Sequence, residues 1–142
     1  MASISTSGLE ELIGDLEAIA NIPDSVILDM LTAEADVIAA EQKAQAAAML
    51  SGETSKGITA QGITYDKKLK TTKDGKAIYV YPKGIRTDGN RRRKAEVAFI
   101  NEYGKKGQPA RPFIRVANEK AADAAAQAAL KVYDNYLKSK NL

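Results

Sequence analysis

Cysteine, histidine and tryptophan are all missing from this 142-residue chain. Without cysteine the chain forms no disulfide and no cysteine-ligated metal site, which suits a reducing compartment. Without histidine it lacks the side chain most often used for acid-base catalysis near neutral pH, and also the commonest zinc ligand. Only carboxylate, lysine or tyrosine chemistry is left. We therefore expect no enzyme, no catalytic residue, no metal site and no cofactor.

Long apolar runs are missing too. No stretch approaches the roughly 20 apolar residues that span a bilayer, and the opening MASISTSGLEE lacks the basic and apolar blocks of a signal peptide. We expect a chain that is made in the cytosol and does not associate with a membrane. Its length predicts one domain, residues 1–142, which is large enough to bury a core without disulfides.

The net charge of +3 conceals an uneven distribution. Residues 1–50 carry nine acids and one lysine, whereas residues 83–115 carry ten basic side chains and three acids. Three interpretations of this acidic first third and basic middle are open. The basic part binds nucleic acid, or it binds the acidic part of another copy, or the two parts are solvated surfaces that never meet.

The spacing of apolar residues predicts two helices in the first fifty residues. The first opens at Ser7, which has the spacing of a capping box, and runs to about Ala20. Its single apolar face consists of Leu9, Leu12, Ile13, Leu16 and Ile19. The paired acids of this helix, such as Glu10 and Glu11, favour the helix dipole and are not predicted to be catalytic.

A second, long helix is predicted to begin at Pro23 or Asp24 and to end at about Leu50. Its apolar stripe narrows to alanine toward the C-terminal end, where we place Ala40, Ala44 and Ala47 at the packing positions. Small side chains let another helix approach closely. We expect the alanine-rich terminal helix to pack there.

β-branched and aromatic residues then predict a hairpin. Its strands are expected over residues 58–69 and 76–81, with a turn at 72–75 that contains an Asp-Gly pair. A cluster of cations follows, and we call it the basic belt. It consists of Arg86, Arg91, Arg92, Arg93 and Lys94. Four adjacent cations on a helix point in all directions, so they would contact phosphates without reading sequence.

The next stretch has the pattern of a rigid connector. A short helix from about residue 95 is predicted to end at Gly104, because glycine is a good C-terminal cap. A short strand over residues 97–100 is the alternative. Pro109 and Pro112 each fix one backbone angle and stiffen the loop between this helix and the last one, which runs to about Ser139. We call residues 102–113 the docking loop. Its candidate residues are Glu102, Tyr103, Gly104, Lys105, Lys106, Pro109, Arg111, Pro112 and Phe113.

Three docking-loop side chains have separate expected roles. Phe113 anchors the last helix in the core, Arg111 pairs with an acid such as Glu102, and Tyr103 packs the end of the short helix. The fold class expected from the whole chain is α+β. It comprises two N-terminal helices with the second one long, a β-hairpin or small antiparallel sheet, a short helix, and a long C-terminal helix packed on the sheet.

The order of these elements, with Glu102-Tyr103-Gly104 followed by Pro109-Ala110-Arg111-Pro112-Phe113, resembles the small tail-component family of long-tailed bacteriophages. These are the tail-completion or head-to-tail joining proteins. The resemblance covers most of the chain in layout, and its specific residues lie in this one stretch. Lys105 departs from the pattern, since family members often have threonine after the glycine.

The resemblance implies a structural virion protein of the neck or tail, assembled in the host cytoplasm. It implies a homo-oligomeric ring, a hexamer, that joins the tail to the head connector and contacts the connector or the tail terminator and tube proteins. DNA would pass through the ring without sequence-specific contacts. The alternative from a different class is a small nucleic-acid-binding protein that uses the basic belt and the docking loop.

Overall fold

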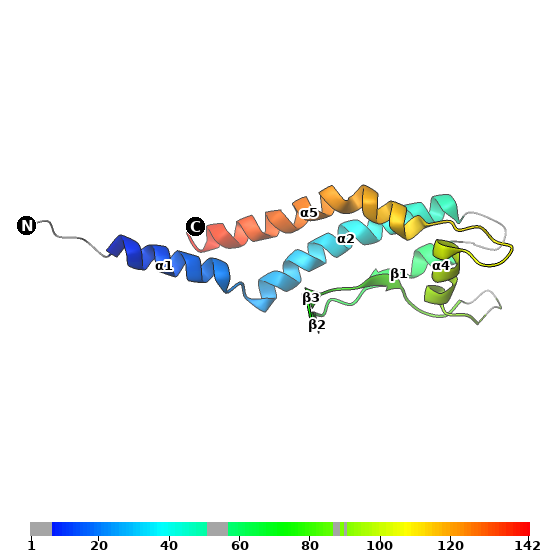
Figure 1. Ribbon diagram of the computed structural model, residues 1–142, viewed down its shortest axis with the longest axis horizontal. Coiled ribbons are helices and arrows are strands. Elements are labelled where there is room, and N and C mark those ends of the chain that lie inside the picture. Colours follow the sequence, from blue (N-terminus) through cyan, green and yellow to red (C-terminus); the bar gives the residue numbers. More distant parts are fainter. Residues whose placement is uncertain (1–6, 51–56, 87–88, 90) are drawn as a thin grey trace, which may run out of the picture.

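The structure, a computed structural model, describes residues 7–50, 57–86, 89 and 91–142. The described residues form an elongated molecule with α1 at one end and α4 near the other (Figure 1). The α-helices are α1 Ser7–Ala20, α2 Asp24–Met49, α3 Ile58–Gly62, α4 Lys94–Tyr103 and α5 Phe113–Ser139. The strands are β1 Ile63–Tyr65, β2 Lys70–Thr72, β3 Gly75–Ala77 and β4 Val80–Pro82. The predicted α+β class and the order of its elements are confirmed.

The largest contact in the fold joins α2 and α5, which lie side by side (Figure 1). The helices are antiparallel, since Gln42 Nε2 donates to Asn118 Oδ1 at 2.9 Å and Arg111, before α5, reaches the carbonyl of Met49 at the end of α2. Most of the buried residues on both helices are alanines, and small side chains allow close approach. We call them the alanine seam: Ala35, Ala39 and Ala46 on α2, and Ala117, Ala121, Ala125 and Ala129 on α5.

Packing of the terminal helix against the alanine end of α2 is as predicted, but the predicted packing positions at that end of α2 were wrong. Ala40, Ala44 and Ala47 are exposed, whereas Ala39 and Ala46, one position earlier, are buried. A run of alanines gives no difference in size between one helix face and the next. The buried face also contains a polar residue, Gln42, whose Nε2 donates to Asn118 Oδ1.

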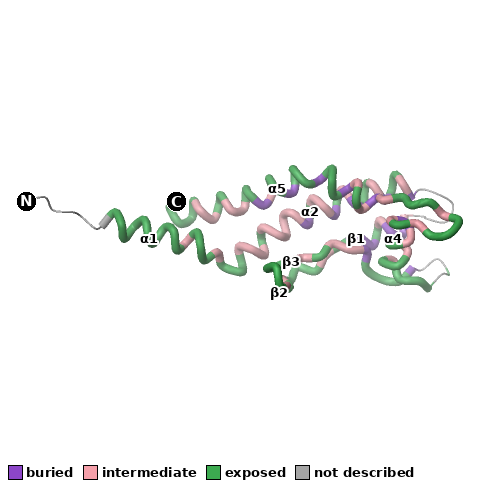
Figure 2. The backbone as a smooth tube through the Cα atoms, viewed as in Figure 1, coloured by how far each residue is buried: buried purple, intermediate pink, exposed green. Residues whose placement is uncertain are grey.

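The terminal helix was expected to pack on the sheet, but its main contact is with α2 instead. α5 packs along α2, and α2 in turn contacts β1 and β4. The main core lies where α2, β1, α4 and α5 meet, and its largest fully buried side chains are Ile63 and Phe113. Figure 2 shows buried residues along α2 and α5 and around α4, whereas α1 is exposed along nearly its whole length.

The strands form two short antiparallel pairs. β2 and β3 flank the predicted turn, with Thr72 opposite Gly75, but β2 lies just after the expected strand over residues 58–69. β1 pairs with β4, with Ile63 opposite Pro82. The expected strand over residues 58–69 was wrong at its start, because Ile58–Gly62 is the helix α3. Its first two side chains are buried and α3 contacts α2 and α4, so tertiary packing overrides the β-propensity of Ile and Thr.

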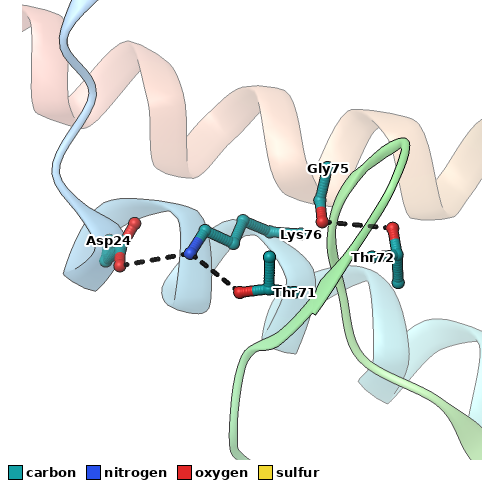
Figure 3. A network of polar contacts seen from close by, with 5 residues as sticks. All are labelled: Asp24, Thr71, Thr72, Gly75 and Lys76. Atoms are coloured by element: carbon teal, nitrogen blue, oxygen red, sulfur yellow. Dashed lines mark hydrogen bonds and ion pairs between the residues drawn. The ribbon is translucent and has the colours of Figure 1, made fainter.

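Polar contacts tie the hairpin to α2. Lys76 Nζ lies 3.7 Å from the carboxylate of Asp24 at the start of α2, and it donates to Thr71 Oγ1 at 3.2 Å (Figure 3). Within the hairpin, Thr72 Oγ1 donates to the carbonyl of Gly75 at 3.1 Å. These exposed contacts orient the hairpin more than they stabilise the fold, since exposed ion pairs contribute about 0–1 kcal/mol.

The helix α1 stands apart from the rest. It begins at Ser7 and ends at Ala20, as predicted, but its apolar face is not covered by the body of the protein. Tyr136 Oη donates to the carbonyl of Ala18 at 3.3 Å and links the end of α1 to α5. No helix in the described part of the chain is both long enough and apolar enough to span a membrane.

The alanine seam predicts a strong size limit at its buried positions. Replacing the fully buried Ala117 with leucine should lower the free energy of unfolding by about 1–3 kcal/mol, because the larger side chain forces the helices apart. Ala122→Leu at an exposed position of the same helix is the matched control and should be nearly neutral. Urea unfolding measures both. Equal midpoints for the two variants would show that the seam is not closely packed.

A second prediction concerns Tyr65 on β1. Its hydroxyl donates to Asp36 on α2, and this hydrogen bond, with burial and the nearby negative charge, raises the pKa of Tyr65 from 10.0 to about 12. Since the folded pKa is the higher one, the contribution to stability is complete below pH 10 and is lost as the pH rises through 12. In an absorbance titration, Asp36→Asn should return this phenol to the range of an ordinary tyrosine, and Tyr65→Phe should remove the late phase. A wild-type titration without a late phase would contradict the contact.

Candidate docking site

Asn101 is the centre of the region around the docking loop. It is only 7% exposed, and its Nδ2 donates to the carbonyl of Val97 at 2.9 Å. Its Oδ1 accepts from Gln108 Nε2 at 3.2 Å and from Arg111 Nη2 at 2.8 Å. Its backbone carbonyl accepts from the Arg111 N–H at 2.6 Å. One buried residue of α4 therefore fixes the far half of the loop.

Glu102 caps the last helix. Its two carboxylate oxygens accept from the backbone N–H groups of Ile114 at 2.8 Å and Arg115 at 3.0 Å. These N–H groups lack partners inside the helix, and a negative charge is favoured at this end of the helix dipole. The expected Glu102–Arg111 ion pair was wrong. Glu102 binds the backbone of α5, and Arg111 binds Asn101 instead.

Gly104 ends α4, as predicted, and the loop crosses directly over it. Its N–H donates to the carbonyl of Ile100 at 2.8 Å, and its φ is +77°, which favours glycine. A Cβ on Gly104 would lie 2.9 Å from both the nitrogen of Ala110 and the carbonyl oxygen of Gln108. The close approach of these two backbone segments therefore depends on glycine at this position.

Phe113 anchors α5, as predicted, and its side chain is fully buried in the core. Pro112 lies immediately before the helix, and its carbonyl accepts from the Val116 N–H at 3.1 Å. By contrast, the expected role of Tyr103 was wrong. Its side chain is 70% exposed, and its ring contacts that of Phe99 at a centroid distance of 4.7 Å. The aromatic pair lies on the surface because positions 99 and 103 share the outer face of α4.

Two members of the basic belt are built into the fold. Arg86 is 9% exposed, and its N–H donates to the carbonyl of Arg92 at 3.0 Å. Lys94 begins α4, and its Cδ lies 2.5 Å from where a Cβ on Gly62 would be, so its stem lies against that glycine. The other three, Arg91, Arg92 and Arg93, are exposed and precede the helix. The four consecutive cations therefore do not share one helix.

A pocket lies between the basic belt and the docking loop, and we call it the cationic pocket. Its described lining contains four cationic side chains and no carboxylate. The cations are Arg86 and Arg92 from the belt and Lys105 and Arg111 from the docking loop. Polar groups of Thr59, Asn101 and Gln108 and apolar groups of Leu50, Val97 and Ile100 complete the lining.

The cationic pocket is suited to an anion. Arginine guanidinium groups bind carboxylates and phosphates with paired hydrogen bonds, and such bonds are stronger than neutral ones. Among the described residues, no carboxylate forms an ion pair with Arg92, Lys105 or Arg111. The described residues also include no group of three or more His, Cys, Asp or Glu placed to hold a metal ion.

A neighbouring cation outside the pocket is neutralised within the chain. Lys83 Nζ donates to Asp66 Oδ1 at 3.0 Å, and Tyr81 Oη donates to Asp66 Oδ2 at 2.9 Å. The hydrogen bond from Lys83, and then that from Tyr81, lowers the pKa of Asp66, and the same contact raises the pKa of Lys83. The cationic pocket differs from this cluster, because no carboxylate among the described residues pairs with its Arg92, Lys105 or Arg111.

The structure brings only part of the predicted site together. Arg86, Arg92, Lys105 and Arg111 line the pocket, whereas Tyr103, Lys106 and Pro109 are exposed outside its lining. Sequence reasoning missed Asn101, Gln108 and Thr59. Only Asn101 left a signal, because an asparagine three positions after Ala98 falls on the buried face of a short apolar helix.

Comparison of the chain with protein-family models, curated proteins and solved structures finds no match.

The crossing at Gly104 yields a prediction with a matched control. Gly107→Ala places a side chain at φ +80° with no atom within 4 Å, so it should cost only the conformational strain of about 1–2 kcal/mol. Gly104→Ala adds a clash with two backbone atoms to a similar strain and should cost clearly more. Denaturant unfolding gives both values. Equal losses would show that the loop does not cross Gly104 closely.

Proposed function

We propose that this chain is a structural bacteriophage protein that assembles into a ring at the head-to-tail interface and joins the tail to the head connector. The observation that carries the proposal is the cationic pocket, whose described lining has no carboxylate to pair with Arg92, Lys105 or Arg111. A neighbouring subunit or virion protein would supply the acidic group. The resemblance around the docking loop is the basis for proposing this kind of assembly.

The rigidity of the docking loop supports a binding role. Asn101 fixes the loop from α4, Glu102 fixes the start of α5, and Gly104 allows the two backbone segments to touch. A pre-formed binding surface loses little conformational entropy when a partner arrives. The same rigid surface would carry load between subunits without rearranging.

The charge distribution supports contacts between copies. Residues 1–50 are strongly acidic and residues 83–115 strongly basic, and α1 and α4 lie toward opposite ends of the molecule (Figure 1). Two different complementary surfaces on one subunit produce a head-to-tail interface, which closes into a ring when the rotation permits. We therefore place the basic belt at contacts between subunits and not along the channel for DNA.

Assembly should depend on salt and on the cationic pocket. Purified protein is expected to form rings, visible by electron microscopy and light scattering, and to dissociate as salt screens the charges. The double variant Arg92→Ala/Lys105→Ala should raise the concentration needed for assembly about tenfold, corresponding to about 1.4 kcal/mol. Lys131→Ala, an exposed cation on α5 far from the pocket, is the matched control and should assemble normally.

Two results would contradict the proposal. One is a protein that stays monomeric at every concentration and salt. The other is tight binding of duplex DNA at physiological salt without assembly, which would instead support the alternative of a small nucleic-acid-binding protein. Fluorescence anisotropy of labelled duplex DNA measures this binding, and the double variant is titrated in parallel. Loss of DNA binding in the double variant would indicate that the basic belt contacts phosphates.

A further inference from the structure

Exposed large apolar side chains gather in two places among the described residues. Five of them lie on α1, and three lie toward the far end of the molecule around α4, whereas Tyr79 and Leu130 are isolated. The five on α1 are Leu9, Leu12, Ile13, Leu16 and Ile19, each between 42% and 57% exposed. The three near α4 are Ile85, Phe99 and Tyr103, each between 58% and 70% exposed.

The five apolar residues of α1 form one continuous face. At 100° per residue they fall within about a third of the helix circumference. Glu10 and Glu17 border this face on one side and Asp15 borders it on the other, with Glu11 behind. α1 carries no lysine or arginine. It is therefore an apolar stripe edged with negative charge, on a helix of 14 residues that is about 21 Å long.

The outer face of α4 has the opposite character. Phe99 and Tyr103 form an exposed aromatic pair, and Ala95 lies one turn before Phe99 on the same face. Ala95 also lines a groove with Ile85 and Arg93. The exposed cations Arg91, Arg92 and Arg93 lie before this face and Lys105 and Lys106 after it. Glu96 lies on the face, whereas Glu102 borders it with its carboxylate already bonded to the start of α5.

The two surfaces cannot meet within one chain, because α1 and α4 lie toward opposite ends of the molecule (Figure 1). A membrane is a poor occupant for α1, since helices that lie on anionic lipid are rich in lysine and arginine, and α1 has neither. The outer face of α4 on a second copy of the chain is complementary to α1. It offers apolar rings for the stripe and cations for its edges.

We propose that α1 of one copy docks lengthwise on the outer face of α4 of the next copy. Its apolar stripe covers Phe99 and Tyr103, and its flanking carboxylates meet the exposed arginines at 91–93 and the lysines at 105 and 106. The contact is head-to-tail, so it propagates from copy to copy. This inference rests on the proposed function, in that it identifies the neighbouring subunit as the partner of the docking site.

The absence of cysteine makes the contact testable by cross-linking in the full-length protein. Copies with Leu12→Cys are mixed with copies that carry Ala95→Cys, and a short bismaleimide joins thiols that lie close together. Because each copy has one thiol, any product links two chains. We expect a prominent heterodimer joined between positions 12 and 95, whereas Leu12→Cys mixed with Leu130→Cys, an isolated exposed position on α5, should give at least tenfold less.

A substitution test separates this contact from assembly in general. Leu12→Lys/Leu16→Lys should raise the assembly concentration at least tenfold without changing the thermal midpoint, since both side chains are exposed in the monomer. Leu130→Lys is the matched control and should assemble as the wild type does. Circular dichroism confirms that α1 remains folded in both variants.

The outcomes distinguish the two proposals. Rings that form normally from Leu12→Lys/Leu16→Lys, or that give no product between positions 12 and 95, would overturn the α1–α4 contact and leave the proposed function standing. A predominant product between two Leu12→Cys copies would also overturn it, because α1 would then pair with α1. A wild-type chain that never assembles would overturn both.

Discussion

Close packing of α5 against α2 is the constraint on which the rest of the structure depends. The alanine seam brings two long helices together, and Phe113 closes it by filling the core where α2, β1 and α4 meet. Small side chains bury little apolar surface each, so the seam gains from its length and from dispersion between closely spaced backbones. The position of Phe113 then fixes where α5 begins. The position of the docking site relative to the core therefore depends on where α5 begins.

The docking loop is held rigidly against the helix that Phe113 anchors, and polar contacts hold it there. Glu102 holds the first turn of α5, Asn101 holds Arg111, and Gly104 lets the returning backbone touch the end of α4. The hydrogen bonds of Glu102 and Asn101 pair groups that would otherwise lack partners, and an unpaired buried polar group costs about 1–3 kcal/mol. The cationic pocket forms beside this network. Arg111 of this pocket is therefore held in place before any partner binds.

Local sequence signals predicted much of the fold, but they did not predict which distant segments contact one another. The bounds of α1, α2 and α5, the hairpin turn and the cap at Gly104 follow from capping residues, periodicity and glycine geometry. The seam's register was missed because alanines look alike on every face. The partner of Glu102 was missed because a carboxylate can bind either arginine or a helix N-terminus. The pocket combines residues from four separate segments between Leu50 and Arg111, and spacing along the chain does not show that they meet.

The large aliphatic side chains of α1 also affect how strongly copies of the chain would associate. Its body is packed largely with alanine, whereas five large aliphatic side chains are left about half exposed on α1. Covering each of them would contribute about 1 kcal/mol, so the stripe as a whole offers about 5 kcal/mol. Association costs at least about 4 kcal/mol in lost freedom. A single α1–α4 contact would therefore be weak without the charges at its edges, and a ring, in which every copy makes two such contacts, would be far more stable than a pair. In the proposed ring, weak single contacts would keep the copies dispersed at low concentration, and closure would stabilise the assembled state.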